Sequence, residues 1–449
     1  MRAALGLLAC ALAALVYQNA LDIPFVFDDR DTVLLNQSLI APWDWRAALL
    51  YNAARPVTNL SFAVDRAFWG FSSFGFHVTN TVLHIAVVAL FYGWCTRTLG
   101  AAAQTGDRSG TAAFPSPDWA AFFAAAVLAV HPVMAAAVGY VTARSELLAA
   151  AGSLAALTYA RRAILRGDRK AGMLAAAFGA LAIGSSSSAA ALPLVVLAFD
   201  AWVLRDPGWP VRAARIYAPA TLAVVTAAAW HAIASPMAVV PERGLLANVL
   251  TESRVVWRYL ALLLVPRGQA IVHDVHWVTS PLDPVSIVAF AALAAAIGVA
   301  VLQRHVRPLA AFGAVWFVGS LAPTILVPVR DAMAEHRLYL AAPGLLLAVA
   351  SVTWRAVASG RTIRFALAAV LFVLAVATYR RNELWSRPAD LWEESVRRAP
   401  GAWQAHWGYA ELLREIGRCD RARPEYDAVL RLYSGHAGAR AGLDLCRQR

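Results

Sequence analysis

Long apolar runs alternate with short polar segments over most of this 449-residue chain. A helix needs about 20 predominantly apolar residues to cross the hydrocarbon core of a bilayer, and runs of about that length recur along the chain. The pattern predicts an all-α, polytopic membrane protein with about eleven spanning helices. We expect these helices near residues 3–19, 78–96, 119–137, 145–160, 171–184, 189–204, 216–235, 285–303, 309–327, 337–354 and 363–379.

The stretch 255–265 is also apolar, but it is short and is flanked by Arg254 and Arg267. A further crossing at this point would move the arginines that follow to the opposite side of the membrane. We therefore interpret the stretch as a helix that lies on the outer membrane surface or dips into it.

The composition supports a membrane protein and argues against a nucleic-acid partner. Hydrophobic residues make up 60% of the chain and charged residues 15%, well below the roughly 25% charged residues of soluble domains. The 40 Lys and Arg residues outnumber the 28 Asp and Glu residues, which gives a net charge of +12. These cations cluster in short loops, as orientation signals do, without the interleaved aromatic residues of a base-stacking groove.

The basic loops alternate along the chain, which predicts its orientation. Arginines gather at 161–169, 205–215, 304–307 and 355–364, and the positive-inside rule places these loops in the cytoplasm. With an odd number of spans, the amino terminus is then cytoplasmic and the carboxyl terminus lies outside. The alanine- and arginine-rich composition indicates a bacterium, so we expect an inner-membrane protein with a periplasmic tail. The outer loops 20–77 and 236–284 are too long for simple connections and predict a site at the outer surface.

The carboxyl-terminal tail has a different composition from the rest of the chain. Spans end near residue 380, which divides the chain into a membrane domain over 1–380 and a helical domain over 381–449. The tail is similar to one 34-residue tetratricopeptide repeat, and flanking helices must cover its faces. The matching positions are Tyr409, Leu413, Gly417, Ala422, Tyr426 and Leu430. Cys419 and Cys446 can pair if the tail is outside the cytoplasm.

Acidic residues directly after the first span are the strongest candidates for catalysis. Asp28 and Asp29 lie beside the membrane surface, where partial desolvation and a neighbouring carboxylate raise a pKa toward the range of a general base. The alternative is structural: the acids cap a loop helix or pair with Arg30 or Arg55. An aspartate pair can also hold a divalent cation, but no spacing elsewhere completes a recognisable metal site, and no cofactor is certain.

Further candidates lie at the outer ends of other spans, where buried polar groups usually face a cavity or a partner helix. An arginine there can grip an anionic headgroup through two hydrogen bonds, and this role suits Arg144 and Arg337. Arg144 can equally be a membrane-surface anchor, and a histidine can equally make an interhelical hydrogen bond. The remaining candidates are Arg55, His77, His131, Glu146, Glu335, His336 and Tyr339.

The order of these motifs resembles a known enzyme family. The chain is similar to the transmembrane-and-tetratricopeptide-repeat protein O-mannosyltransferases and their bacterial relatives, over nearly its whole length. The motifs that carry this resemblance are Asp28-Asp29, Arg55-Pro56-Val57-Thr58-Asn59, Gly75-Phe76-His77-Val78-Thr79-Asn80, His131-Pro132-Val133, Arg144-Ser145-Glu146 and Arg337-Leu338-Tyr339, followed by the repeat-like tail.

The resemblance implies a GT-C glycosyltransferase fold and a sugar donor linked to polyprenyl phosphate. It implies that Asp28 or Asp29 activates the acceptor hydroxyl, in the eukaryotic branch Ser or Thr of a protein, and that Arg337 and Arg144, with Tyr339, bind the donor phosphate. If the acceptor hydroxyl displaces the phosphate directly, the configuration of the sugar's anomeric carbon inverts. Ser186 and Ser187 stand where the family usually has lysine and glutamate. This departure keeps an alternative open, a catalytically inactive relative that acts as a membrane-anchored interaction protein.

Overall fold

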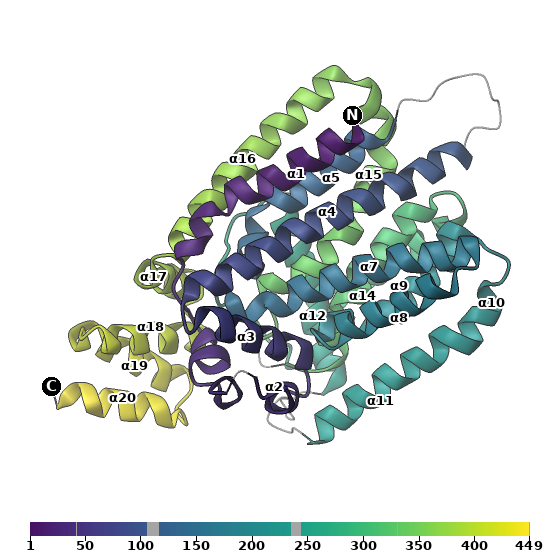
Figure 1. Cartoon of the computed structure of the whole chain (residues 1–449). Helices are drawn as coiled ribbons and strands as arrows, with labels where there is room; N and C mark the ends of the chain where they lie inside the picture. Colours follow the sequence, from purple (N-terminus) through teal and green to yellow (C-terminus); the bar gives the residue numbers. More distant parts are fainter. Residues whose placement is uncertain (42, 106–115, 235–243, 330, 449) are drawn as a thin grey trace.

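The architecture was analysed in a computed structural model that describes residues 1–41, 43–105, 116–234, 244–329 and 331–448. The described residues form helices and connections without a β-strand, which confirms the predicted all-α class. The helices of the membrane domain pack side by side in a bundle, and the tail helices lie at one end of it (Figure 1).

Seven helical segments among the described residues are long and apolar enough to cross a membrane, or eight if one bent pair counts as a span. The seven contain α1 (Arg2–Val16), α4 (Ser73–Thr105), α9 (Leu192–Ala198), α13 (Pro284–Leu302), α14 (Pro308–Leu326), α15 (Leu338–Ser359) and α16 (Arg361–Trp385). The bent pair consists of α5 (Asp118–Val130) and the segment Pro132–Val138, which includes α6 (Ala135–Val138), at an angle of 48°.

The other three predicted spans are also helical, but they do not meet the same criteria of length and apolarity. They correspond to α7 (Arg144–Arg166), α8 (Arg169–Ile183) and α11 (Ala218–Ala234). α7 and α8 form a hairpin: Gly167 turns the chain in the left-handed region with φ 63°, and the Asp168 carboxylate accepts a hydrogen bond from Ala171 N that caps α8. α7 is buried along much of its length, whereas α8 packs against it and buries only Ala171 and Ala182.

Close packing in the bundle depends on small residues. α14 and α15 approach each other at Gly313 and Gly344, where a Cβ on Gly313 would lie 2.3 Å from the Gly344 carbonyl oxygen. Small residues at such contacts let helix backbones come together, and van der Waals packing then stabilises the pair. This contact fixes the position of the amino-terminal end of α15, which carries several site residues.

The first outer loop is folded into short helices rather than an irregular excursion. The loop contains η1 (Gln18–Asp22), η2 (Arg30–Leu34), η3 (Gln37–Leu39), α2 (Trp45–Tyr51) and α3 (Pro56–Trp69). Two buried amides hold it together: Asn36 donates to Asn59 Oδ1 at 2.7 Å, and Asn59 donates to the Ala48 carbonyl oxygen at 2.6 Å. A rigid loop can therefore present the residues after the first span in one fixed arrangement.

The second outer loop is built around α12 (Leu245–Leu264). The apolar stretch 255–265 is helical as predicted, but the helix begins ten residues earlier and packs against α13 and α14. Residues 235–243 of the predicted loop lie outside the described residues. The segment 265–283 that follows α12 is extended and irregular, and it crosses toward the tail.

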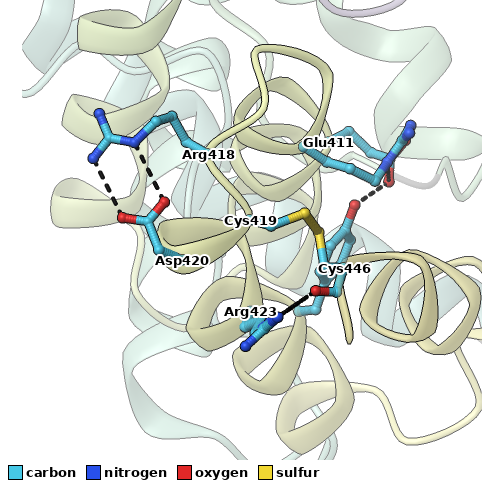
Figure 2. The surroundings of a disulfide bond; sticks show 8 residues. Glu411, Arg418, Cys419, Asp420, Arg423 and Cys446 are labelled. Atoms are coloured by element: carbon cyan, nitrogen blue, oxygen red, sulfur yellow. Dashed lines mark hydrogen bonds and ion pairs between the residues drawn. A yellow bond between two sulfur atoms is a disulfide. The ribbon is translucent and has the colours of Figure 1, made fainter. Parts of the chain in front are cut away.

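The tail consists of α17 (Pro388–Arg398), α18 (Trp403–Glu415), α19 (Cys419–Leu432) and α20 (Ala437–Arg447). α18 and α19 form the helix–turn–helix that the repeat pattern predicts, with Gly417 at φ 78° in the turn. Cys419 and Cys446 form a disulfide that ties α20 to α19, with Cα atoms 5.2 Å apart (Figure 2). Val272 of the second outer loop belongs to the apolar core of the tail, so the two parts share packing.

Candidate active site

A cavity of about 600 Å³ lies where the membrane domain meets the tail. Its walls come from the first outer loop, the turn between α6 and α7, the segment after α12, the residues before α15, and the tail. Aromatic and small apolar side chains make up much of the wall, and the ionisable residues among its lining are Asp28, Arg55, Tyr140, His273, Asp274, Asp331, Glu335, His336, Arg337 and Tyr433.

The two aspartates after the first span face different surroundings. Phe27 adopts φ 53°, a left-handed conformation that is uncommon for an aromatic residue and concentrates at functional sites. After this turn, Asp28 is exposed and lines the cavity, whereas Asp29 is fully buried. Only one of the two candidate bases therefore lies on the cavity wall.

Asp29 ties the first outer loop to the turn that precedes α7. One carboxylate oxygen accepts hydrogen bonds from the backbone N–H and the hydroxyl of Thr142, both at 2.7 Å. The other oxygen accepts from Val26 N at 3.2 Å and Val141 N at 3.4 Å. Burial raises the pKa of Asp29 to about 7, against the opposing effect of these donors. The carboxylate fixes the position of its neighbour Asp28.

Two arginines bring positive charge to the same cavity. Arg337 lies at the start of α15, and its Nη1 donates to the carbonyl oxygens of Asp331 at 2.7 Å and Ala332 at 3.2 Å. Arg55 precedes α3 as its N-cap residue, and it also lines the cavity. The cavity thus combines a carboxylate with guanidinium groups from two different elements, the arrangement that transfer from an anionic leaving group requires.

Glu335 holds the segment after α12 against the start of α15. Its Oε1 accepts from Ala270 N at 2.7 Å and lies 2.9 Å from His273 Nε2, and its Oε2 accepts from Gln269 Nε2 at 3.0 Å. Both oxygens are thereby engaged, so Glu335 positions this wall, and with it the His273 ring. The ring of the next residue, His336, lies beside that of Tyr140, with the two ring centroids 6.0 Å apart.

Arg144 is absent from the cavity lining and is fully buried behind it. Its guanidinium forms an ion pair with Asp65 at 2.5 Å and donates to Asn80 Oδ1 at 2.7 Å and to the Phe76 carbonyl oxygen at 2.9 Å. Because these partners come from α3 and α4, Arg144 joins three elements. Sequence reasoning did not single out Asp65.

Glu146 is also buried, two residues further along α7. Its Oε1 accepts hydrogen bonds from Ser186 Oγ at 2.7 Å and Ser188 Oγ at 3.0 Å. The serines that stand in place of the family's lysine and glutamate therefore include one that contacts a predicted site residue directly.

The remaining predicted residues lie outside the cavity lining, in the interior of the bundle. Tyr339 Oη is 2.6 Å from His84 Nδ1. His131 donates from Nε2 to the Leu263 carbonyl oxygen at 3.1 Å, and its Nδ1 accepts from Val133 N, as an N-cap does. His77 is fully buried in α4.

The tail closes one side of the cavity. Gly401, Trp403, Gln404 and Tyr433 contribute to its lining. Gly401 N donates to Asp274 Oδ2 at 3.2 Å, and further polar contacts join Arg30 to Glu415 and Arg398 to the Gln269 carbonyl oxygen. These contacts cross from the outer loops to the tail, so the tail is part of the site and not an appendage.

Sequence reasoning predicted a site at the long outer loops but named none of the residues of the second outer loop as candidates. His273 and Asp274 lie on the cavity wall through that loop. The adjacent His273 and Asp274, with His276 two residues further on, are the signal that could have indicated them. Among the described ranges, no group of three or more His, Cys, Asp or Glu side chains is arranged to hold a metal ion.

Comparisons with known proteins support the resemblance that the motifs predicted. The chain is 32% identical to the protein O-mannosyl-transferase Tmtc3 of Drosophila melanogaster over 170 residues, which cover 34% of this chain and 18% of the relative. It is 28% identical to tmtc2 of Xenopus laevis over 154 residues, or 31% of this chain and 16% of the relative.

A longer alignment reaches almost the full chain. The human protein O-mannosyl-transferase TMTC1 is 22% identical over 510 aligned positions, which cover 97% of this chain and 56% of the relative. The chain therefore matches only part of each of these longer proteins. No protein-family model and no solved structure matches the chain.

Proposed function

We propose that the chain is a membrane glycosyltransferase that moves a sugar, mannose or another hexose, from a polyprenyl-phosphate-linked donor to a hydroxyl acceptor, Ser or Thr of a protein. One observation carries the proposal: Asp28, Arg55 and Arg337 line one cavity at the end of the membrane helices. The relatives that are named as protein O-mannosyl-transferases support the class of reaction.

In the proposed reaction, Asp28 accepts the proton of the acceptor hydroxyl as its oxygen bonds to the anomeric carbon. The bond between that carbon and the phosphate oxygen breaks on the opposite face, so the configuration inverts. Negative charge grows on the departing polyprenyl phosphate. Arg337, which is held by its two carbonyl contacts, and Arg55 line the cavity where they can stabilise this charge. Glu335 and Asp29 act as positioning residues, because their oxygens are engaged by the chain itself.

Arg144 and Tyr339 serve this proposal indirectly. The ion pair of Arg144 with Asp65 locks the start of α7 against α3, and Tyr339 joins α15 to α4 through His84. We therefore assign the binding of the donor phosphate to Arg337 and Arg55. Glu146, His77 and His131 belong to the supporting structure for the same reason, since each is buried away from the cavity lining.

The tail supplies the acceptor side of the cavity. Trp403 and Tyr433, with ring centroids 5.5 Å apart, form an aromatic surface at its wall. Such surfaces suit a peptide or a sugar face. We place this side outside the cytoplasm, in the bacterial periplasm, and the Cys419–Cys446 disulfide supports an oxidising compartment.

One observation favours a second candidate, a catalytically silent relative that anchors the tail as an interaction module. The lysine and glutamate of the family are absent, and Ser186 donates to Glu146 in their place. If that lysine is needed to hold the donor, this chain binds partners without transferring sugar.

The test is glycosyl transfer by the purified full chain in lipid, supplied with polyprenyl-phosphate mannose or glucose and a Ser/Thr peptide. Asp28→Asn and Arg337→Ala should abolish most transfer. Asp31→Asn is the matched control, because Asp31 is an exposed carboxylate three residues further on that does not line the cavity. Transfer that survives both Asp28→Asn and Arg337→Ala contradicts the assignment. Donor binding without transfer by the wild-type chain supports the silent relative.

A further inference from the structure

A second cavity lies at the opposite end of the bundle from the candidate active site. It has a volume of about 540 Å³ and is formed by α1, α5 and α16. We name it the α1–α16 groove and define it by its apolar lining of Leu8, Leu12, Phe122, Phe123, Phe365 and Phe372, with Trp119, Arg361 and Arg364 at one end.

The groove faces the lipid phase of the membrane. All three of its helices belong to segments long and apolar enough to cross a bilayer, counting α5 with the bent pair. α16 is largely uncovered, since only 11% of its most apolar stretch is buried, and Phe365 and Phe372 are 63% and 71% exposed. An apolar hollow in such a surface is filled by hydrocarbon chains.

The charged end of the groove and the candidate active site lie at opposite ends of α16. Arg364 and Trp385 lie 21 residues apart on α16, a distance of about 30 Å along a helix, which equals the thickness of the hydrocarbon core. Trp385 lines the active-site cavity. The arginines therefore lie at the other membrane face, where α1 also begins (Figure 1).

The two guanidinium groups at this end have aromatic and carbonyl contacts, but no described carboxylate forms an ion pair with either. Arg364 lies over the Trp119 ring at 5.2 Å and donates to the Ala358 carbonyl oxygen at 3.0 Å, and Arg361 lies over Phe365 at 5.7 Å. The nearby acid, Asp118, is engaged by Arg2 at 2.6 Å. The amino-terminal end of α16 adds a partial positive charge.

We propose that the α1–α16 groove binds one anionic glycerophospholipid, with the phosphate between Arg361 and Arg364 and the acyl chains along the phenylalanines of α5 and α16. Charge complementarity selects the headgroup: two cations at the membrane surface attract an anionic lipid and leave a zwitterionic one without a net gain. The apolar lining accepts the chains of either lipid, so the arginines alone provide the selectivity.

The test is native mass spectrometry of the full chain, delipidated in neutral detergent and titrated with phosphatidylglycerol or phosphatidylcholine of identical acyl chains. One copy of phosphatidylglycerol should bind the wild-type chain about 30-fold more tightly than phosphatidylcholine, from about 5-fold per arginine. Arg361→Gln and Arg364→Gln should each remove about 5-fold of this preference. Arg355→Gln is the matched control, because Arg355 lies over Trp354 at the same end of the bundle but outside the groove.

A groove-filling variant, Ala368→Trp, checks the same site without changing its charge, since Ala368 is part of the lining. It should block the tightly bound lipid while both arginines remain. Equal affinity of the wild-type chain for the two lipids, or a preference that persists in the Arg361→Gln, Arg364→Gln double variant, overturns the proposal. Displacement of phosphatidylglycerol by equimolar polyprenyl phosphate also overturns it, because the groove would then be a carrier site.

Discussion

Asp28 and Asp29 are adjacent in the chain, and the same substitution at each should have opposite consequences. Asp29 accepts four hydrogen bonds, two on each carboxylate oxygen. Asparagine keeps one acceptor oxygen and replaces the other with an NH₂ donor. In Asp29→Asn that donor faces backbone N–H groups, so at least one pair of donors, such as those of Val26 and Val141, loses its acceptor.

The magnitude follows from those two unsatisfied donors. A buried donor left unsatisfied costs about 1–3 kcal/mol, and the longer bonds to Val26 and Val141 suggest the lower part of that range. Near pH 4 the substitution removes little charge from the folded protein, because burial raises the pKa of Asp29 to about 7 and the carboxyl is then protonated, so the lost hydrogen bonds decide the change in stability. We expect Asp29→Asn to lower the free energy of unfolding by about 2–3 kcal/mol. Transfer should be reduced through the displaced neighbour.

The assay pairs thermal unfolding in detergent, at one fixed scan rate, with the transfer rate at a temperature where both variants are folded. Asp28→Asn should leave Tm close to wild type, within about 0.5 kcal/mol of stability, while transfer falls by about 10²- to 10⁴-fold, the contribution of a general base. Asp29→Asn should lower Tm by several degrees and retain measurable transfer. If Asp29→Asn abolishes transfer at an unchanged Tm while Asp28→Asn remains active, Asp29 is the base and the reasoning from burial fails.

Three further outcomes follow from described contacts. Burial raises the folded-state pKa of Asp29 to about 7 from an ordinary value of 3.8, so the stabilisation by its bound proton is fully present below pH about 4 and is lost as pH rises through 7. The wild-type Tm should therefore fall from pH 5 to pH 8 more steeply than that of Asp29→Asn. Arg144→Gln leaves Asp65 buried without its ion pair, and should cost about 3–5 kcal/mol in unfolding measurements. Removing the disulfide with Cys419→Ala and Cys446→Ala should destabilise the tail by about 3–4 kcal/mol, measured as faster limited proteolysis of residues beyond 419; an unchanged digestion rate would contradict this estimate.

The apolar pattern predicted the helices well because helix formation in a bilayer depends on interactions within one segment of the chain. Each of the eleven predicted regions contains a helix, since a run of apolar residues in a bilayer must satisfy its backbone hydrogen bonds internally. The pattern did not distinguish helices that meet the length and apolarity of a span from those that do not. α8 has 15 residues and α11 has 17, so both are shorter than the about 20 residues that a crossing needs.

The membership of the cavity was harder to predict from the sequence because it depends on which side of a short element a residue faces. Arg144 and Arg337 each precede a predicted span and looked equivalent. Arg144 meets Asp65, which lies 79 positions earlier in the chain, whereas Arg337 donates to carbonyl groups only five and six residues away and remains on the cavity wall. A buried partner that decides the role of an arginine cannot be found from the arginine's own motif.

The second outer loop illustrates the same limit for residues without a motif. His273 is placed by Glu335, 62 positions later, and its wall is closed by the tail, which the sequence presents as a separate domain. Only the length of the loop, beyond what a connection requires, indicated that it had a function. The resemblance to a family implied roles for Asp28 or Asp29 and for Arg337 and Arg144, but it implied none for His273 or Asp274.

The junction between the outer loops and the tail constrains how an acceptor can reach Asp28. Phe27, whose left-handed backbone orients the aspartates, packs its ring against Trp392 of α17 at 5.5 Å. Asp274 on the cavity wall accepts from Gly401 N, where any Cβ would lie 2.5 Å from the carboxylate oxygen. The tail therefore touches both the residue next to the proposed base and the opposite wall. Under the proposed function, a movement of the tail that admits a protein segment also alters the support of Asp28, and the proposal therefore couples acceptor binding to the placement of the base.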